Sequence, residues 1–127
     1  MLKRLGLCAL LVTGCNSSAG PTPIDVTGSW TGSWSLTSGP LQEWTGSLNQ
    51  SGTAVTGDIL CAFSESYTVS GTNKGDKLAL TLVGVSGDTV QFKGNVYVTG
   101  GVTASGQFNG GATGCFAGSG TWAGSLL

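Results

Sequence analysis

Apolar and polar residues alternate along most of the chain from Val26 onward, and Ser-Gly, Lys-Gly-Asp and Gly-Gly sequences interrupt this alternation. A period of two residues is typical of β-strands with one buried face, and no segment after Val26 has the spacing of an amphipathic helix. The short connections predict consecutive hairpins in a meander. The predicted strands are Gly28–Thr37, Leu41–Gln50, Thr53–Cys61, Ser66–Thr72, Lys77–Val83, Thr89–Val98, Gly101–Asn109 and Gly114–Leu126.

A short repeat, apolar-x-Gly-x-apolar, occurs within these strands, first as Trp30-Thr-Gly32-Ser-Trp34 and then in most of the others. Because side chains alternate along a strand, the glycine lies on the same face as its apolar neighbours. Glycine weakens a flat sheet, whereas a tightly coiled sheet needs it where strands bend. We therefore predict an all-β fold, an antiparallel up-and-down meander of about eight strands closed into a small barrel. A flattened β-sandwich is the alternative.

The N-terminus differs from this pattern. Lys3 and Arg4 precede an apolar run, Leu5–Val12, which is followed by Thr13-Gly14-Cys15. The run is too short to cross a bilayer, which needs about 20 residues. A positively charged N-terminal region, a short apolar segment and small residues at the cleavage site are typical of an export signal peptide. We expect this signal peptide to be helical.

Val12-Thr13-Gly14-Cys15 resembles the bacterial lipobox, in which small residues precede a cysteine that receives diacylglycerol before cleavage. This resemblance implies a signal peptide over 1–14, a lipidated Cys15 with a flexible tether over 15–25, and a barrel domain over 26–127. It also implies export and anchoring to the bacterial cell envelope. Asn16, directly after the cysteine, resembles the residue at this position in lipoproteins sorted to the outer membrane. Either the periplasmic or the surface face of that membrane is compatible with the sequence. An ordinary secretory signal is the alternative, with Cys15 available for a disulfide.

The remaining cysteines predict one disulfide. Cys8 lies in the signal peptide and Cys15 takes the lipid, so Cys61 and Cys115 form the remaining pair, as expected in an exported protein. Cys61 ends the third predicted strand and Cys115 begins the eighth, which places both at the same end of a meander. Two thiols in a chain without histidine cannot complete a tetrahedral zinc site, so no metal site is expected.

Composition indicates a folded domain and excludes several partners. Charged residues make up 9% of the chain and hydrophobic residues 39%, the opposite of a disordered chain. The net charge is −1, and after removal of the signal peptide the chain contains three lysines and six acidic side chains. The chain has no stripe of basic residues that could neutralise phosphates. We therefore expect no nucleic-acid binding and no basic amphipathic helix on a membrane surface.

Catalytic chemistry is sparse, and we expect the protein not to be an enzyme and to hold no cofactor. The lack of histidine excludes the Ser-His-Asp triad and its cysteine analogue. Glu43 and Asp58 lie on neighbouring predicted strands, but the alternation places both on the outer, solvated face. Glu65, Asp76 and Asp88 lie in or beside predicted turns. No catalytic residue is predicted.

Gly28-Ser29-Trp30, at the start of the first strand, resembles the Gly-x-Trp opening of lipocalins and avidins. In those families the tryptophan closes one end of the barrel and the other end binds a small apolar ligand or biotin. This chain departs from them in having no basic residue on its last strand, and the polar residues that bind biotin have no counterparts here. Most of the mature chain, for example Leu48–Gly57, resembles uncharacterised bacterial lipoproteins with glycine-rich strands.

Three functions are compatible with these features. The first is a lipoprotein attached to the lipid bilayer by its diacylglyceryl anchor, with the barrel as a structural or interaction module. The second is lipocalin-like binding of a small apolar ligand, and the third is inhibition or binding of an unidentified protein partner through loops near Cys61 and Cys115. The tryptophans fill the core in the first case and contact the ligand in the second: Trp30, Trp34, Trp44 and Trp122.

Overall fold

The computed structural model of the protein describes residues 23–127 apart from 38, 62–64 and 112–113. The predicted signal peptide, Cys15 and most of the predicted tether lie outside the described residues. Within the described part, no helix is long and apolar enough to span a membrane.

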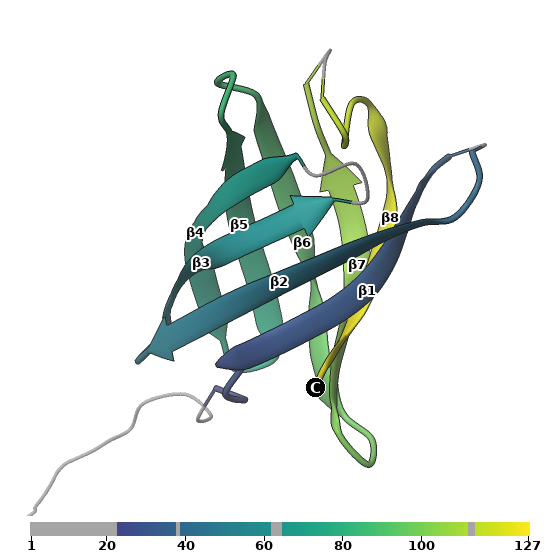
Figure 1. Ribbon diagram of the computed structural model, residues 1–127. Coiled ribbons are helices and arrows are strands. Elements are labelled where there is room, and N and C mark those ends of the chain that lie inside the picture. Colours follow the sequence, from purple (N-terminus) through teal and green to yellow (C-terminus); the bar gives the residue numbers. More distant parts are fainter. Residues whose placement is uncertain (1–22, 38, 62–64, 112–113) are drawn as a thin grey trace, which may run out of the picture.

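Eight antiparallel strands form one closed barrel in which each strand pairs with the next and β8 pairs with β1 (Figure 1). The predicted meander barrel is therefore confirmed, and the alternative of a flattened sandwich is wrong because the strands form a single closed sheet. The strands are β1 (Gly28–Leu36), β2 (Gln42–Ser51), β3 (Ala54–Cys61), β4 (Ser66–Lys74), β5 (Lys77–Gly84), β6 (Thr89–Val98), β7 (Val102–Asn109) and β8 (Ser119–Leu126).

Seven strands start and end within two residues of the predicted bounds, and the eighth does not. β8 begins at Ser119 and not at Gly114. Gly114 and Gly118 have φ angles of 94° and 93°, values that interrupt an extended strand and favour glycine. The described residues between β7 and β8, 110–111 and 114–118, therefore form a loop.

The interior contains the alternate residues of every strand, as the period of two predicts. In the repeat of β1, Trp30 and Trp34 are 2% and 6% exposed, and Gly32 lies between them on the same face. The buried apolar residues are Val26, Trp30, Trp34, Trp44, Leu48, Val55, Ile59, Cys61, Tyr67, Val69, Leu78, Leu80, Leu82, Val90, Phe92, Val96, Ala104, Phe108, Phe116 and Trp122.

The inward glycines are required because strands approach each other too closely for a side chain. Gly94 of β6 pairs with Gly106 of β7, and a Cβ atom on either would overlap backbone atoms of the other strand. Gly32 and Gly124 serve a second purpose, since the indole of Trp44 occupies the space that their side chains would fill. Close strand approach and bulky neighbours together account for the glycine repeat.

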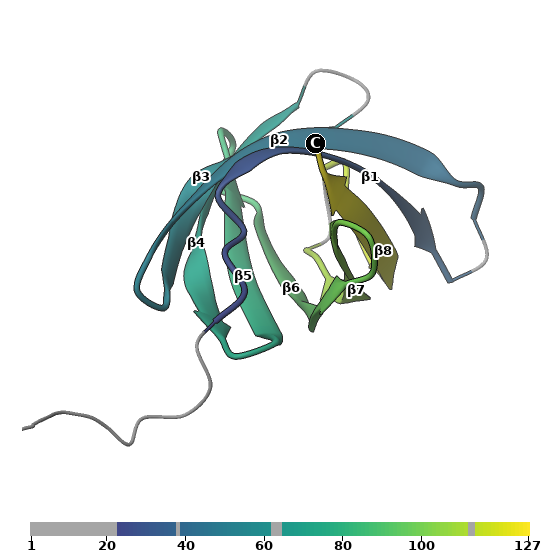
Figure 2. The same ribbon diagram turned by 90° about the horizontal axis from the view of Figure 1, so that it is seen from below.

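The two ends of the barrel differ. We call the end where the described chain begins the tether end, which contains the connections at 52–53, 75–76 and 99–101. The opposite end, which we call the disulfide end, contains the connections at 37–41, 62–65, 85–88 and 110–118. Figure 2 looks into the tether end and shows the first described residues crossing its opening.

Candidate functional site

The four tryptophans predicted as ligand contacts all lie in the core, with 2% to 6% of their surface exposed. Trp30 Nε1 donates a hydrogen bond to Val26 O at 2.8 Å, which links the first strand to the segment that crosses the tether end. Two other indoles donate hydrogen bonds to backbone carbonyls of neighbouring strands. Trp44 Nε1 donates to Ser33 O and Trp122 Nε1 donates to Gln107 O, both at 3.1 Å. Whether these tryptophans bind a ligand stays a prediction.

Trp34 is the exception among the tryptophans. Its Nε1 is buried and has no hydrogen-bond acceptor among the described residues. An unbonded buried N–H costs about 1–3 kcal/mol. Trp34 is therefore the indole with a free donor inside the barrel.

Phe116 closes the disulfide end from within. It belongs to the loop between β7 and β8, yet its side chain is 0% exposed. Its ring centroid lies 4.9 Å from that of Trp34, 5.3 Å from Phe92, 5.4 Å from Tyr67 and 5.7 Å from Phe108. These distances are within the range of favourable aromatic pairs. Trp122 stacks on Phe92 with centroids 5.1 Å apart. We call these rings the aromatic cluster: Trp34, Tyr67, Phe92, Phe108, Phe116 and Trp122.

The predicted disulfide between Cys61 and Cys115 is present and lies next to Phe116 along the chain. The two Cα atoms are 6.5 Å apart, within the range that a disulfide requires. Both cysteines lie at the disulfide end, as the meander predicts. Cys61 ends β3 as expected, whereas the prediction that Cys115 begins the eighth strand is wrong, because Cys115 lies in the loop before β8.

A polar network supports this loop. The Cys115 N–H lies 2.6 Å from Glu65 Oε1 and 3.1 Å from Tyr67 Oη, and the Tyr67 hydroxyl donates to Glu65 Oε1 at 3.1 Å. Burial of Tyr67 raises the pKa of its hydroxyl above 10.0, and the hydrogen bond to the Glu65 carboxylate raises the pKa further. Glu65 and the two cysteine sulfurs would form a group of three metal ligands within 4.8 Å, but the disulfide uses both sulfurs.

The tether end is closed by the segment 23–27, which we call the N-terminal strap. Val26 is 0% exposed, and its N–H donates to Gln50 Oε1 at 3.1 Å. Asn73, a fully buried polar residue on β4, donates from Nδ2 to Ile24 O at 2.6 Å and to Gln50 Oε1 at 3.2 Å. Ile24 falls in the range predicted as tether, and it packs against the core.

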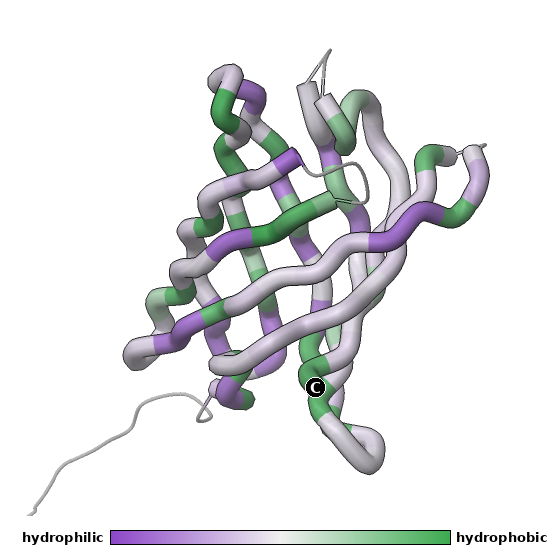
Figure 3. The backbone as a smooth tube through the Cα atoms, in the orientation of Figure 1, coloured by the Kyte–Doolittle hydropathy of each residue, from purple (hydrophilic) through white to green (hydrophobic). Residues whose placement is uncertain are grey.

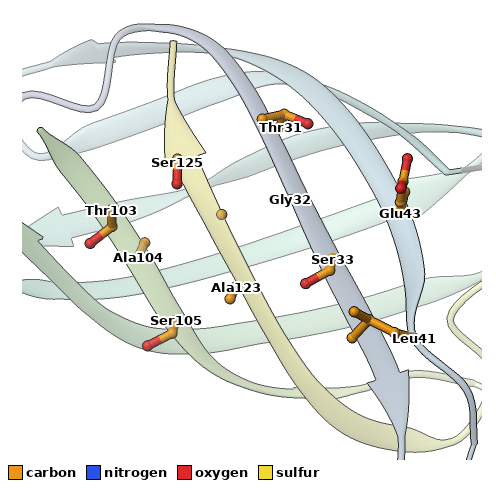
Figure 4. A pocket seen from close by; sticks show the side chains of 11 residues that line it. Thr31, Gly32, Ser33, Leu41, Glu43, Thr103, Ala104, Ser105, Ala123 and Ser125 are labelled. Atoms are coloured by element: carbon orange, nitrogen blue, oxygen red, sulfur yellow. The ribbon is translucent and has the colours of Figure 1, made fainter.

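A hollow of about 580 Å³ lies on the outer wall, across β1, β2, β7 and β8 (Figure 4). Its polar groups are mainly hydroxyls, and Glu43 is the charged residue that lines it. The hollow is therefore a depression between outward side chains and not a lipocalin-like internal pocket. Its lining is Thr31, Gly32, Ser33, Leu41, Glu43, Thr103, Ala104, Ser105, Ala123, Gly124 and Ser125.

The predicted outward position of Glu43 and Asp58 is confirmed, since both are exposed on the outer wall. Sequence reasoning did not single out Phe116, Tyr67 or Asn73 as residues that close the barrel. The signal for Asn73 was a polar residue at an inward position, two residues after Gly71 and four after Val69. No protein-family model, curated protein or solved structure matches the chain.

Proposed function

We propose that this chain is an exported bacterial lipoprotein, held at the cell envelope by a diacylglyceryl group on Cys15, whose barrel is a closed structural or interaction module. The lipobox-like Val12–Cys15 segment supports the anchor. The disulfide between Cys61 and Cys115 is consistent with a protein outside the cytoplasm, because such bonds persist in oxidising compartments.

The observation that favours a module over a carrier is closure at both ends. Phe116 fills the disulfide end and Val26 of the N-terminal strap fills the tether end, and both are 0% exposed. Between them, large side chains occupy the interior. A carrier of drug-sized cargo needs an internal pocket of about 300 Å³ or more. Contacts with other molecules are therefore assigned to the outer wall and the loops.

The anchor is tested by the intact mass of the full chain expressed in a bacterium and extracted from its membranes. The expected product begins at Cys15, carries diacylglycerol and lacks two hydrogens because of the disulfide. Cys15→Ser should accumulate as the uncleaved precursor, whereas Cys8→Ser, a matched change inside the signal peptide, should be processed normally. An unmodified mature chain cut at another residue would contradict the anchor.

A second function, binding of a small apolar ligand, is favoured by one observation. Trp34 Nε1 is an unused donor within the aromatic cluster, next to a Phe116 ring that belongs to a loop. A ligand with an apolar body and one acceptor oxygen would suit that position if Phe116 moved aside. Native mass spectrometry of the membrane-extracted protein distinguishes the two functions. The closed module predicts no retained molecule. A molecule that is lost in Trp34→Phe but kept in Trp44→Phe, whose indole already donates to Ser33 O, would favour the carrier.

A further inference from the structure

The described chain enters the barrel at the tether end. Ile24 is bound there by Asn73, and its N–H lies 3.3 Å from Gly75 O, in the turn between β4 and β5. Pro23 follows Cys15 by eight positions, and eight fully extended residues span at most about 28 Å. An anchor on Cys15 would therefore keep the tether end close to the bilayer.

Charge also distinguishes the two ends. Among the described residues the disulfide end contains the carboxylates of Glu43, Glu65 and Asp88 and no lysine. Phosphatidylglycerol and other anionic headgroups repel such an end within about one Debye length, roughly 10 Å at 0.1 M salt.

The tether end contains Lys74 and Lys77 together with Asp25 and Asp76, so the charges of these side chains balance there. Lys74 and Lys77 are register partners across the β4–β5 hairpin. Like charges directly opposite each other destabilise a hairpin. An external anionic surface would attract both ammonium groups at once.

Exposed apolar side chains lie at the tether end on β6 and just after β8. Tyr97 and Val98, at the end of β6, are 47% and 64% exposed, and Leu127 is 81% exposed. Tyr97 pairs with Thr103, and Thr103 pairs with Ser125, two residues before Leu127. The ends of β6 and β8 are therefore separated by β7, and all three residues are on the tether end of the barrel, where Figure 3 shows hydrophobic residues near the C-terminus. Tyrosine with an apolar ring and a polar tip is enriched at membrane interfaces.

We propose that the tether end is a bilayer-contacting surface, with Tyr97, Val98 and Leu127 against the headgroup region and Lys74 and Lys77 against anionic headgroups. The inference rests on the proposed lipid anchor and adds the orientation of the barrel. Leu41 and Val85 at the disulfide end are 73% and 89% exposed, so apolar exposure alone does not select an end. The entry point of the chain and the charge distribution select it.

The test is hydroxyl-radical footprinting of the full-length expressed and processed protein. The protein is compared in detergent micelles and in vesicles of phosphatidylethanolamine with phosphatidylglycerol, after the vesicles have been floated in a density gradient. Oxidation of Tyr97 and Leu127 should fall several-fold in vesicles, while oxidation of Leu41 and Val85 at the opposite end should not change.

Variants test the electrostatic part. Replacing Lys74 and Lys77 together with glutamine should weaken the protection of Tyr97 in vesicles that contain phosphatidylglycerol. The same variant should behave as the native chain in vesicles of phosphatidylcholine alone. Lys93→Gln, which removes an exposed lysine from the middle of β6, is the matched control and should leave the protection unchanged.

The outcomes distinguish failure of the orientation alone from failure of the anchor. Failure of the protein to float with vesicles would overturn the lipid anchor and the orientation together. Flotation with Leu41 and Val85 protected in place of Tyr97, or with neither end protected, would overturn the orientation and leave the anchor intact. Flotation with Tyr97 protected supports both.

Discussion

Replacement of Phe116 by alanine tests whether this loop residue is part of the core. Its side chain is 0% exposed and its ring lies within 5.7 Å of four other ring centroids. Transfer of a buried phenylalanine side chain back to water costs about 1.5–3 kcal/mol. The vacated space, on the order of 100 Å³, adds roughly 2 kcal/mol if the surroundings do not collapse. We expect Phe116→Ala to lower the free energy of unfolding by about 3–5 kcal/mol.

The assay is urea unfolding followed by tryptophan fluorescence, to which the four buried indoles contribute, among them Trp34 against Phe116. The midpoint should fall while the slope against urea is unchanged, because the surface exposed on unfolding is nearly the same. Val85→Ala removes an 89% exposed side chain at the same end and should change stability by less than about 0.5 kcal/mol.

Ligand rescue extends the prediction. A cavity lined by aromatic rings takes up small aromatic molecules, and a ligand at 100 times its Kd stabilises by about 2.7 kcal/mol. Phenol should raise the midpoint of Phe116→Ala more than toluene does, because the phenol oxygen can accept the free Trp34 N–H. A loss of stability below about 1 kcal/mol in Phe116→Ala would refute the claim that Phe116 completes the core.

Three further outcomes follow from the structure. Replacing Cys61 and Cys115 together with serine should cost about 4 kcal/mol in urea unfolding, as expected for a loop of 54 residues, and no loss would show that the loop is held without the bond. Gly94→Ala forces a Cβ atom onto backbone atoms of β7 and should lower the free energy of unfolding by about 1–3 kcal/mol, measured by thermal unfolding. Gly101→Ala is the control, because a Cβ atom there has no neighbour within 4 Å, and it should leave stability unchanged. Equal effects of the two substitutions would contradict the close-approach explanation. Because the pKa of Tyr67 is raised in the folded state, its contribution to stability should be complete below pH 10.0 and fall as the pH rises toward the folded-state pKa. In Tyr97→Phe, which leaves Tyr67 as the one tyrosine, a tyrosinate midpoint below pH 10.0 in the folded protein would contradict this sign.

The strand order and barrel closure were predictable because both depend on local information. Alternation assigns each residue to a face, and short turns force neighbouring strands to pair. The glycine repeat then selects a coiled, closed sheet over two flat ones. The disulfide was predicted from the cysteine count, and the topology is consistent with it because Cys61 and Cys115 fall at one end of the meander.

The closures of the barrel were harder to predict, because they depend on backbone turns and contacts distant in sequence. The alternation of β8 continues backward through Gly118 to Phe116, so an inward Phe116 looks like a strand residue. Positive φ angles at Gly114 and Gly118 convert that segment into a loop, and no local pattern specifies them. At the tether end, Ile24 lies in a polar, proline-containing segment typical of a tether, yet Asn73, 49 residues later, binds its carbonyl.

The two closures use different physical means, and this difference bears on function. The disulfide end is fixed by a covalent bond beside Phe116. The N-terminal strap is held by the hydrogen bond from Asn73 to Ile24 O, by the bond from the Val26 N–H to Gln50 Oε1 and by burial of Val26. Hydrogen bonds of this kind each contribute about 1 kcal/mol, so the strap is the closure that a pulling or binding partner would displace first. The strap also leads directly toward Cys15. If the chain is anchored as proposed, tension between membrane and barrel acts on the weaker closure, while the disulfide end keeps its shape for contacts away from the bilayer.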